Sequence, residues 1–203
     1  MEKSIVTPDQ YPLTLNALTN ACNQKSSRNP VMSLSQGEVQ NTVRLLGEKK
    51  LVRIEENFKR GVEKYAQRFC NTQFGELKLD AAEFAIITLL FLRGPQTPGE
   101  LKSHSGRLHG FAENQSVVDA LNGLIERETG PLVIRLPRTP GRKDSEYMHL
   151  FSGEIDLDAY AQQHEQEKAR TVRDDKRTSM AELEKRVCVL EEELVEIRKL
   201  LGK

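Results

Sequence analysis

The chain has no tryptophan, and aromatic residues make up only 5% of its 203 residues. Its three cysteines, Cys22, Cys70 and Cys188, are too widely spaced for a CxxC metal or redox motif, so we expect packed, reduced thiols. No apolar run approaches the roughly 18 residues that a membrane-spanning helix needs. The first ten residues lack the apolar core of a signal peptide. These absences predict a cytoplasmic protein that does not enter a membrane.

A net charge is also missing, because 30 Lys and Arg residues balance 30 Asp and Glu residues. The charges are unevenly distributed along the chain, however. Residues 1–70 hold eleven basic and seven acidic residues, residues 71–151 nine and ten, and residues 152–203 ten and thirteen. The basic excess in the first third makes it the more suitable part for binding nucleic acid.

Catalytic motifs are absent from the sequence. His104 and His109 lie five residues apart around a glycine-containing turn, without a cysteine or carboxylate at metal-ligand spacing. No phosphate-binding GxxxxGK[ST] loop occurs, because the segment from Gly94 to Thr97 is a break between helices. We therefore expect no enzymatic activity, no cofactor and no metal site.

The segment from residue 81 to residue 151 has a complete pattern of three helices and a hairpin. Ala81 to Arg93 is an apolar helix that stops at Gly-Pro, and Thr97 to Glu100 forms a capping box that opens a second helix. A third helix is expected from Gln115 to Glu128. Pro131 to Leu136 and Tyr147 to Phe151 then read as the two strands of a hairpin. This is the order of a winged helix.

A similar order occurs earlier in the chain. Thr7 to Gln10 has the same Thr-Pro start, and we expect it to play the same capping role ahead of a helix from Leu13 to Asn23. The capping box Ser35 to Glu38 predicts the third helix. Leu51 to Ile54 and Val62 to Phe69 are the expected strands. The sequence thus predicts a tandem repeat with an inserted loop in the first copy.

The expected fold class is mostly α with small β-hairpins (α+β), as tandem winged-helix domains followed by a C-terminal coiled-coil helix. The first unit spans residues 1–72 and lacks most of its N-terminal helix, since only Met1 to Ile5 precede Thr7. Either the given chain starts inside that helix or the unit borrows one from elsewhere. The second unit spans 73–152, a charged linker or solvated helix 153–178, and the coiled-coil helix 179–203.

The C-terminal segment carries a regular heptad pattern over about three heptads, which predicts self-association, with a homodimer as the expected product. The alternative is an amphipathic helix that folds back on the body of the protein. The residues of the predicted seam are Met180, Leu183, Val187, Leu190, Leu194, Ile197 and Leu201.

The first unit offers candidate DNA-binding residues on its third helix and in its hairpin loop. If Val39, Val43 and Leu46 face inward, the outward residues are Gly37, Gln40, Asn41 and Arg44. Gln, Asn and Arg side chains can bond to base edges in a major groove. In the loop, Lys59 and Arg60 would meet phosphates. The alternative is that these polar residues only keep the helix soluble.

The third helix of the second unit has a different outward face, with Asp119 and Glu126 beside Gln115 and Asn122. Its carboxylates would oppose a phosphate backbone. Two functions therefore remain open: DNA binding or transcriptional regulation through the first unit, with double-stranded DNA as partner, or a protein-protein adaptor without DNA.

Six short strings in residues 1 to 151 are distinctive. They are Tyr11-Pro12-Leu13, Ala21-Cys22-Asn23-Gln24-Lys25, Asn29-Pro30-Val31-Met32, Arg68-Phe69-Cys70-Asn71, Arg93-Gly94-Pro95-Gln96-Thr97-Pro98-Gly99-Glu100-Leu101 and Tyr147-Met148-His149-Leu150-Phe151. They resemble strings of the bacterial YceH family. The resemblance implies a tandem winged-helix fold and no established activity. Family members normally begin with a helix that ends in a pair like Glu2-Lys3, so the start of this chain is similar to the tail of that helix.

Overall fold

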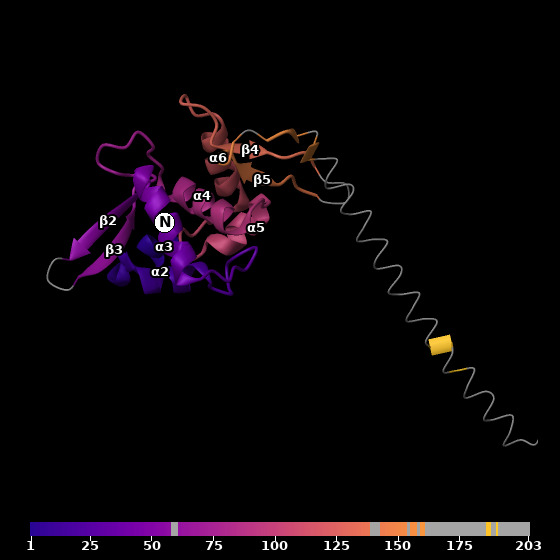
Figure 1. Cartoon of the computed structure of the whole chain (residues 1–203). Helices are drawn as coiled ribbons and strands as arrows, with labels where there is room; N and C mark the ends of the chain where they lie inside the picture. The colour runs from indigo at the N-terminus through magenta and orange to yellow at the C-terminus, as the bar shows by residue number, and fades with distance from the viewer. Residues whose placement is uncertain are drawn as a thin grey trace, which may run out of the picture. The chain divides into compact units, whose positions relative to one another are not determined.

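The structure is a computed structural model that describes residues 1–57, 61–138, 143–153, 155–157, 159–160, 186–187 and 190. It divides into two compact units, Met1–Glu154 and Ile155–Lys203. The first unit is a mixed α and β structure with small antiparallel sheets (Figure 1). Its elements are α1 (Glu2–Val6), the 3-10 turn η1 (Pro8–Gln10), β1 (Leu13–Thr14), α2 (Leu15–Cys22), α3 (Gln36–Glu48), β2 (Val52–Asn57), β3 (Val62–Gln67), α4 (Ala81–Arg93), α5 (Pro98–Ser105), α6 (Asn114–Ile125), β4 (Val133–Arg135) and β5 (Tyr147–His149).

The first half of this unit, residues 1–72, packs α2 and α3 against a three-stranded sheet. The strand order is β1-β3-β2, and both pairings are antiparallel. The capping box predicted at Ser35 is present, since the Ser35 side chain accepts from Glu38 N–H and Glu38 bonds back to Ser35. Two residues of the predicted inner stripe of α3 are buried, Val39 at 3% and Val43 at 5% exposed, whereas the third, Leu46, is half-buried. Amphipathic periodicity therefore sets which face of α3 meets solvent.

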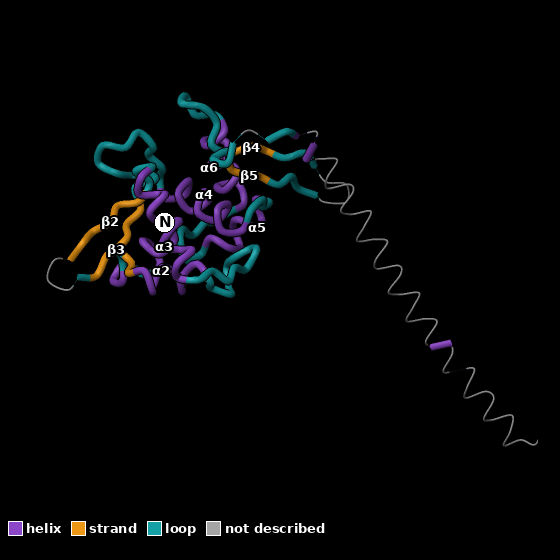
Figure 2. Tube along the Cα trace, in the orientation of Figure 1, coloured by secondary structure: helices purple, strands orange, loops and turns teal. Residues whose placement is uncertain are grey.

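The second half, residues 73–153, is built around α4 (Figure 2). Phe84 to Leu90 are all buried, because α5, α6 and the β4-β5 hairpin each pack on this helix. Gly94 ends α4 at φ +74, a backbone angle that glycine adopts without strain. Thr97 then opens α5 with the predicted capping box. The stripe of α6 expected to face inward, Val117, Leu121 and Leu124, is fully buried.

The sequence prediction placed the N-cap of α2 at the wrong threonine. Thr7 caps no helix with its side chain, and only the three-residue turn η1 follows it. The cap of α2 is Thr14, whose hydroxyl accepts from Ala17 N–H. The physical reason is Pro12, which has no backbone N–H to donate and holds Tyr11 extended at φ −93 and ψ 137, so a helix cannot continue from Thr7.

With Thr14 in place of Thr7, the repeat matches closely. Thr14 opens α2 and Thr97 opens α5, and both helices contain eight residues. The residue before each cap bonds to the returning strand of the hairpin: Leu13 pairs with Tyr65, and Gln96 exchanges backbone hydrogen bonds with Tyr147 at 3.2 and 2.8 Å. Each half therefore has an extended segment that joins its hairpin immediately before the second helix.

The two halves differ greatly in their cores. The larger core belongs mainly to the second half and also takes in Cys70 and, at its edge, Met1 and Phe69. Among the described residues of the first half, the main cluster of buried side chains is Val39, Val43 and Tyr65, with half-buried apolar side chains around it, and Leu13 and Ala66 are buried as well. A partly open, mostly apolar cavity of about 310 Å³ lies among these residues of the first half. Most of the buried apolar surface that stabilises the unit is thus in the second half.

The first half begins with the short helix α1, at the place where the sequence predicted that most of a helix is missing. It is held by Arg28, whose guanidinium contacts the Glu2 carboxylate at 2.6 Å and the Ala21 carbonyl oxygen at 3.0 Å. The Arg28 side chain is 7% exposed and that of Glu2 is 15% exposed. The ion pair is therefore well shielded from solvent and fixes α1 against the end of α2.

Four rings join the two halves. Phe69, which follows β3, packs edge-on against Phe91 of α4 and Phe151, with ring centroids 5.4 and 4.8 Å apart. His149 of β5 lies 4.6 Å from Phe91. Edge-to-face aromatic pairs add directional contacts to the burial of surface. The short link of residues 71–80 favours a contact between the two halves, but the sequence did not predict that these aromatic residues form it.

In the second unit, only two residues of the predicted heptad seam are described. Val187 and Leu190 are 51% and 53% exposed. Met180, Leu183, Leu194, Ile197 and Leu201 lie outside the described residues. The coiled coil remains a prediction.

Candidate nucleic-acid interface

The outer face of α3 carries three of the predicted DNA-binding residues. Asn41 and Arg44 are exposed, as predicted, whereas Gln40 is half-buried. Gln40 directly follows the buried Val39, so part of its side chain is covered by the packing of that stripe. Lys59 and Arg60, the two predicted residues of the hairpin loop, lie outside the described residues.

Helix α3 ends in a turn that places a lysine beside this face. Leu51 N–H donates to the Leu46 carbonyl and Lys50 N–H to the Gly47 carbonyl, both at 2.9 Å. This is the hydrogen-bond pattern of a Schellman motif, in which the residue after the C-cap is usually glycine because it is left-handed. Here that residue is Lys50, at φ +62. Lys50 thus holds a strained backbone conformation, and such strain is concentrated at functional sites in proteins.

A shallow hollow of about 490 Å³ lies where α3, this turn and the hairpin meet. Arg44 enters it from α3 and Lys50 from the turn, while Arg53 belongs to β2 and Arg68 follows β3. Arg68 is tied to the turn, because its backbone N–H donates to the Leu51 carbonyl at 2.7 Å. The complete lining is Arg44, Gly47, Glu48, Lys50, Val52, Arg53, Ile54 and Arg68.

The charge of the hollow is strongly positive for its size, with four cations against the single carboxylate of Glu48 in its lining. Arg53 forms an ion pair with Glu55, and both side chains are exposed, so solvent screens this pair. Among the described residues, Arg44, Lys50 and Arg68 form no ion pair within 4.0 Å. Three cationic side chains are thus available to an anionic partner.

Arg44 also influences the sheet beneath α3. Burial, together with the hydrogen bond that the Tyr65 phenol donates to the Glu63 carboxylate at 2.5 Å, raises the pKa of that phenol to about 12, while the charge of Arg44 acts in the opposite direction. Arg44 thus lies close enough to this phenol for its charge to act on the phenol's pKa.

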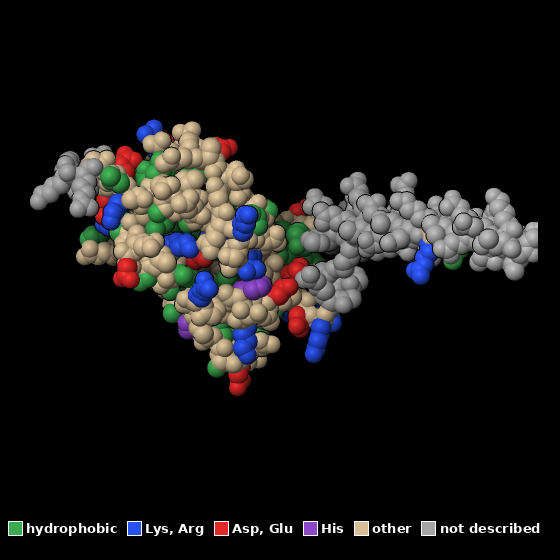
Figure 3. Space-filling model, turned by 90° about the horizontal axis from the view of Figure 1, so that it is seen from below, with side chains coloured by type: hydrophobic (Ala, Val, Ile, Leu, Met, Phe, Trp, Pro, Cys, Tyr) green, Lys and Arg blue, Asp and Glu red, His purple; other side chains and the backbone are tan. Residues whose placement is uncertain are grey.

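Helix α6 presents the expected contrast. Gln115 donates to the Asp119 carboxylate at 2.8 Å, and Asn122 and Glu126 are exposed along the same helix. Its acidic face would repel phosphate. Figure 3 shows one face of the protein, on which acidic and basic side chains are interspersed rather than gathered by sign. The hollow is a local feature and does not reflect a generally basic surface.

Sequence reasoning missed Lys50, Arg53 and Arg68. Arg44 could be found from helical periodicity, but the other three lie in a turn, on a strand and after a strand, and only the tertiary structure brings them together. The excess of basic residues in residues 1–70 was the one available signal.

Other classes of site leave little trace in the part of the chain that the structure describes. No group of three or more His, Cys, Asp or Glu side chains there could hold a metal ion. No helix among the described residues is both long and apolar enough to cross a bilayer. His104 takes part in a polar network: its Nδ1 lies 2.8 Å from Gln96 Oε1 and its Nε2 3.4 Å from an Arg93 guanidinium nitrogen.

Comparison with known proteins identifies the class of protein. A family model described as a protein of unknown function, DUF480, matches residues 1–142. A UPF0502 protein of Vibrio vulnificus is 50% identical over 203 residues, which cover all of this chain and 91% of the relative. A UPF0502 protein of Klebsiella pneumoniae is 53% identical over 156 residues, 77% of this chain and 72% of the relative.

The chain therefore belongs to the DUF480 family of uncharacterised bacterial proteins. UPF0502 is the same family, and YceH is its other name, so the family predicted from the sequence strings is confirmed.

Proposed function

We propose that the protein is a tandem winged-helix protein that binds double-stranded DNA through its first half. The observation that carries the proposal is the hollow: three cations without an ion pair among the described residues lie beside an exposed α3 face that ends in a strained Lys50. In winged helices, the third helix enters the major groove and the hairpin contacts the backbone. Arg44 and Asn41 would read bases, while Lys50, Arg53 and Arg68 would hold phosphates.

The repeat supports the winged-helix assignment. Each half has the order helix, helix, helix, hairpin, with an extended residue that joins the hairpin before the second helix. The predicted heptad of residues 179–203 would pair two such chains and so bring two α3 helices onto neighbouring half-sites.

The test is selection from a pool of random duplex DNA, followed by a salt series on the selected sequence. The variant replaces Arg44, Lys50 and Arg68 with Ala; the control replaces Lys25, Lys102 and Arg107, which lie outside the hollow. Each lost phosphate contact lowers the magnitude of the slope of log K against log salt by about 0.9. We therefore expect a decrease of about 1.8 in the variant, from the loss of Lys50 and Arg68, and none in the control. Equal slopes in the two variants would show that the side chains of the hollow do not contact DNA phosphates.

The acidic face of α6 favours a second function for the second half, namely a protein contact. If neither the chain nor the control variant binds DNA at low salt, the adaptor function replaces DNA binding as the proposal. A partner for that face would be basic, because it must complement Asp119 and Glu126.

A further inference from the structure

The loop of residues 71–79, between β3 and α4, is closed by a single asparagine. Asn71 donates from its backbone N–H to the Leu77 carbonyl at 2.9 Å. Its side chain also clamps Leu79, accepting from the backbone N–H at 2.7 Å and donating to the carbonyl at 2.8 Å. Asn71 reaches these partners from a left-handed conformation, φ +57. The base of the loop is therefore fixed by three hydrogen bonds from one residue.

Further contacts attach the loop to the second half. Leu79 is 6% exposed and Leu77 packs against the edge of the larger core. Arg127, at the end of α6, donates to the Lys78 carbonyl at 2.7 Å and to the Glu83 carboxylate at 3.2 Å. A loop with one buried leucine, one half-buried leucine and hydrogen-bonded backbone groups has a defined shape before any partner binds.

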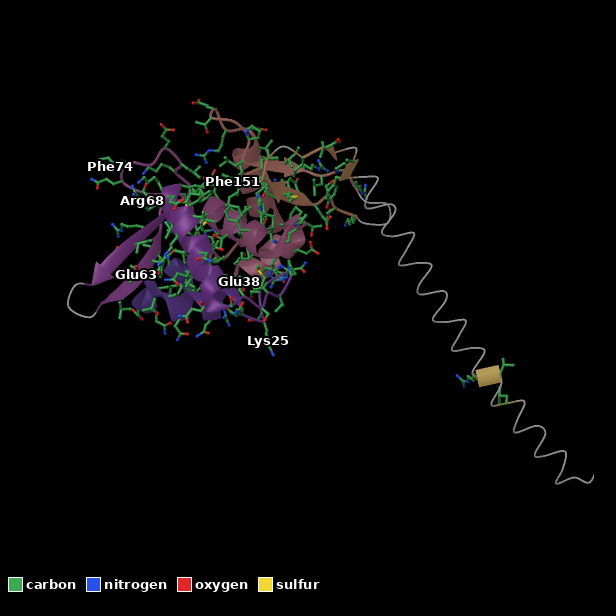
Figure 4. The ribbon with its side chains drawn as sticks, viewed as in Figure 1. Lys25, Glu38, Glu63, Arg68, Phe74 and Phe151 are labelled. Carbon is green, nitrogen blue, oxygen red and sulfur yellow. The ribbon has the colours of Figure 1, made fainter. Side chains whose placement is uncertain are left out.

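This ordered loop carries an aromatic ring that the fold does not bury. Phe74 is 90% exposed, more than any other large hydrophobic residue among those the structure describes. An exposed Phe contributes almost nothing to stability, because burial of the ring is what stabilises. Figure 4 shows Phe74 at the outer edge of the unit, with Arg68 on the same side.

The position of Phe74 relative to the hollow indicates its partner. Arg68 lines the hollow, and only two residues separate it from Asn71, the base of the loop. The ring is thus held a short chain distance from side chains that suit phosphates. Single-stranded and distorted nucleic acids are bound by this pairing of cations for the backbone with aromatic rings for the bases. If Phe74 instead docked into an apolar pocket of a protein partner, the neighbouring cations would have no role in that contact.

We propose that Phe74 stacks on an unpaired or unstacked base of the nucleic acid whose backbone lies in the hollow. The inference rests on the proposed nucleic-acid function and adds the class of substrate: a duplex with a base that is already free, such as a bulge or mismatch. Such a base is favoured because the protein need not spend binding energy on unstacking it.

The first experiment compares binding to a perfect duplex and to the same duplex with a single-nucleotide bulge. The protein is expected to prefer the bulged DNA, and Phe74→Ala to lower affinity for it by about 5- to 150-fold, as stacking on one base allows. The salt slope should stay unchanged, because no cation is lost. Phe74→Ala should fold normally, given the exposure of the ring, and circular dichroism checks this.

The second experiment uses the absence of tryptophan from the chain. Phe74→Trp introduces a single tryptophan, whose fluorescence can be excited selectively over that of the four tyrosines. Stacking on a base should quench this fluorescence when the bulged DNA is added. The matched control is Met32→Trp, at a residue that is 46% exposed in the loop between α2 and α3. The fluorescence of this control variant should not change when the same DNA is added.

The two proposals fail in different ways. If the protein binds DNA with the expected salt slope but Phe74→Ala binds bulged DNA as tightly as the unmodified chain, or the fluorescence of Phe74→Trp is not quenched, the stacking role is wrong and the DNA function stands. If no DNA of either form binds at low salt, both proposals fall.

Discussion

The hydrogen bonds of the Asn71 side chain to Leu79, called the clamp here, should contribute measurably to the free energy of unfolding. Asn71→Ala removes two side-chain hydrogen bonds to Leu79, each worth about 1 kcal/mol net. Alanine in the left-handed conformation costs about another 1 kcal/mol. The free energy of unfolding should therefore fall by about 3 kcal/mol in total.

Two further variants separate these contributions. Asn71→Gly loses the hydrogen bonds but relieves the backbone, so it should cost about 2 kcal/mol. Asn71→Asp keeps the acceptor for the Leu79 N–H and loses the donor to the Leu79 carbonyl, so it should cost about 1 kcal/mol. Urea unfolding followed by circular dichroism gives the values, provided that the m value stays constant. Costs within about 0.5 kcal/mol of zero for all three variants, the additivity error of such measurements, would refute the clamp.

Two other predictions follow from strained or buried groups. Lys50→Gly should stabilise the protein by about 0.5 to 1 kcal/mol, since glycine adopts φ +62 without strain, and it should weaken DNA binding. Urea unfolding measures the first effect and a binding titration measures the second. A loss of stability would contradict the assignment of a strained turn at Lys50. Burial lowers the pKa of His149, and burial with the charge of Arg93 lowers that of His104. Below about pH 6.5 the unfolded chain therefore binds more protons than the folded chain, so the free energy of unfolding should decrease as the pH falls below this value. The double variant His149→Phe, His104→Gln should show a weaker dependence of the free energy of unfolding on pH.

Local sequence signals predicted the elements whose cause is local. The capping boxes at Ser35 and Thr97 depend on residues three apart, and the buried stripe of α6 depends on helical spacing. The Thr7 cap failed because Pro12, five residues further on, prevents the helix that Thr7 would open. A cap signal must therefore be read together with the prolines that follow it.

The candidate site was only partly visible in the sequence for a different reason. Arg44 lies on a helix whose period reveals its outer face, whereas Arg53 and Arg68 meet it only because the hairpin folds beside the end of α3. Nothing in the sequence singles out Phe74, since a phenylalanine is expected in a core. The hydrogen bonds of Asn71 and Arg127 hold its loop in place and leave the ring outside.

The two halves, alike in architecture, divide stability and surface chemistry between them. The second half holds the large core around α4, while the first half has a small core beside a 310 Å³ cavity and carries the basic hollow. Regions with few buried apolar contacts open at lower free energy than the rest of a protein. We therefore expect the first half to open at a lower free energy than the second half.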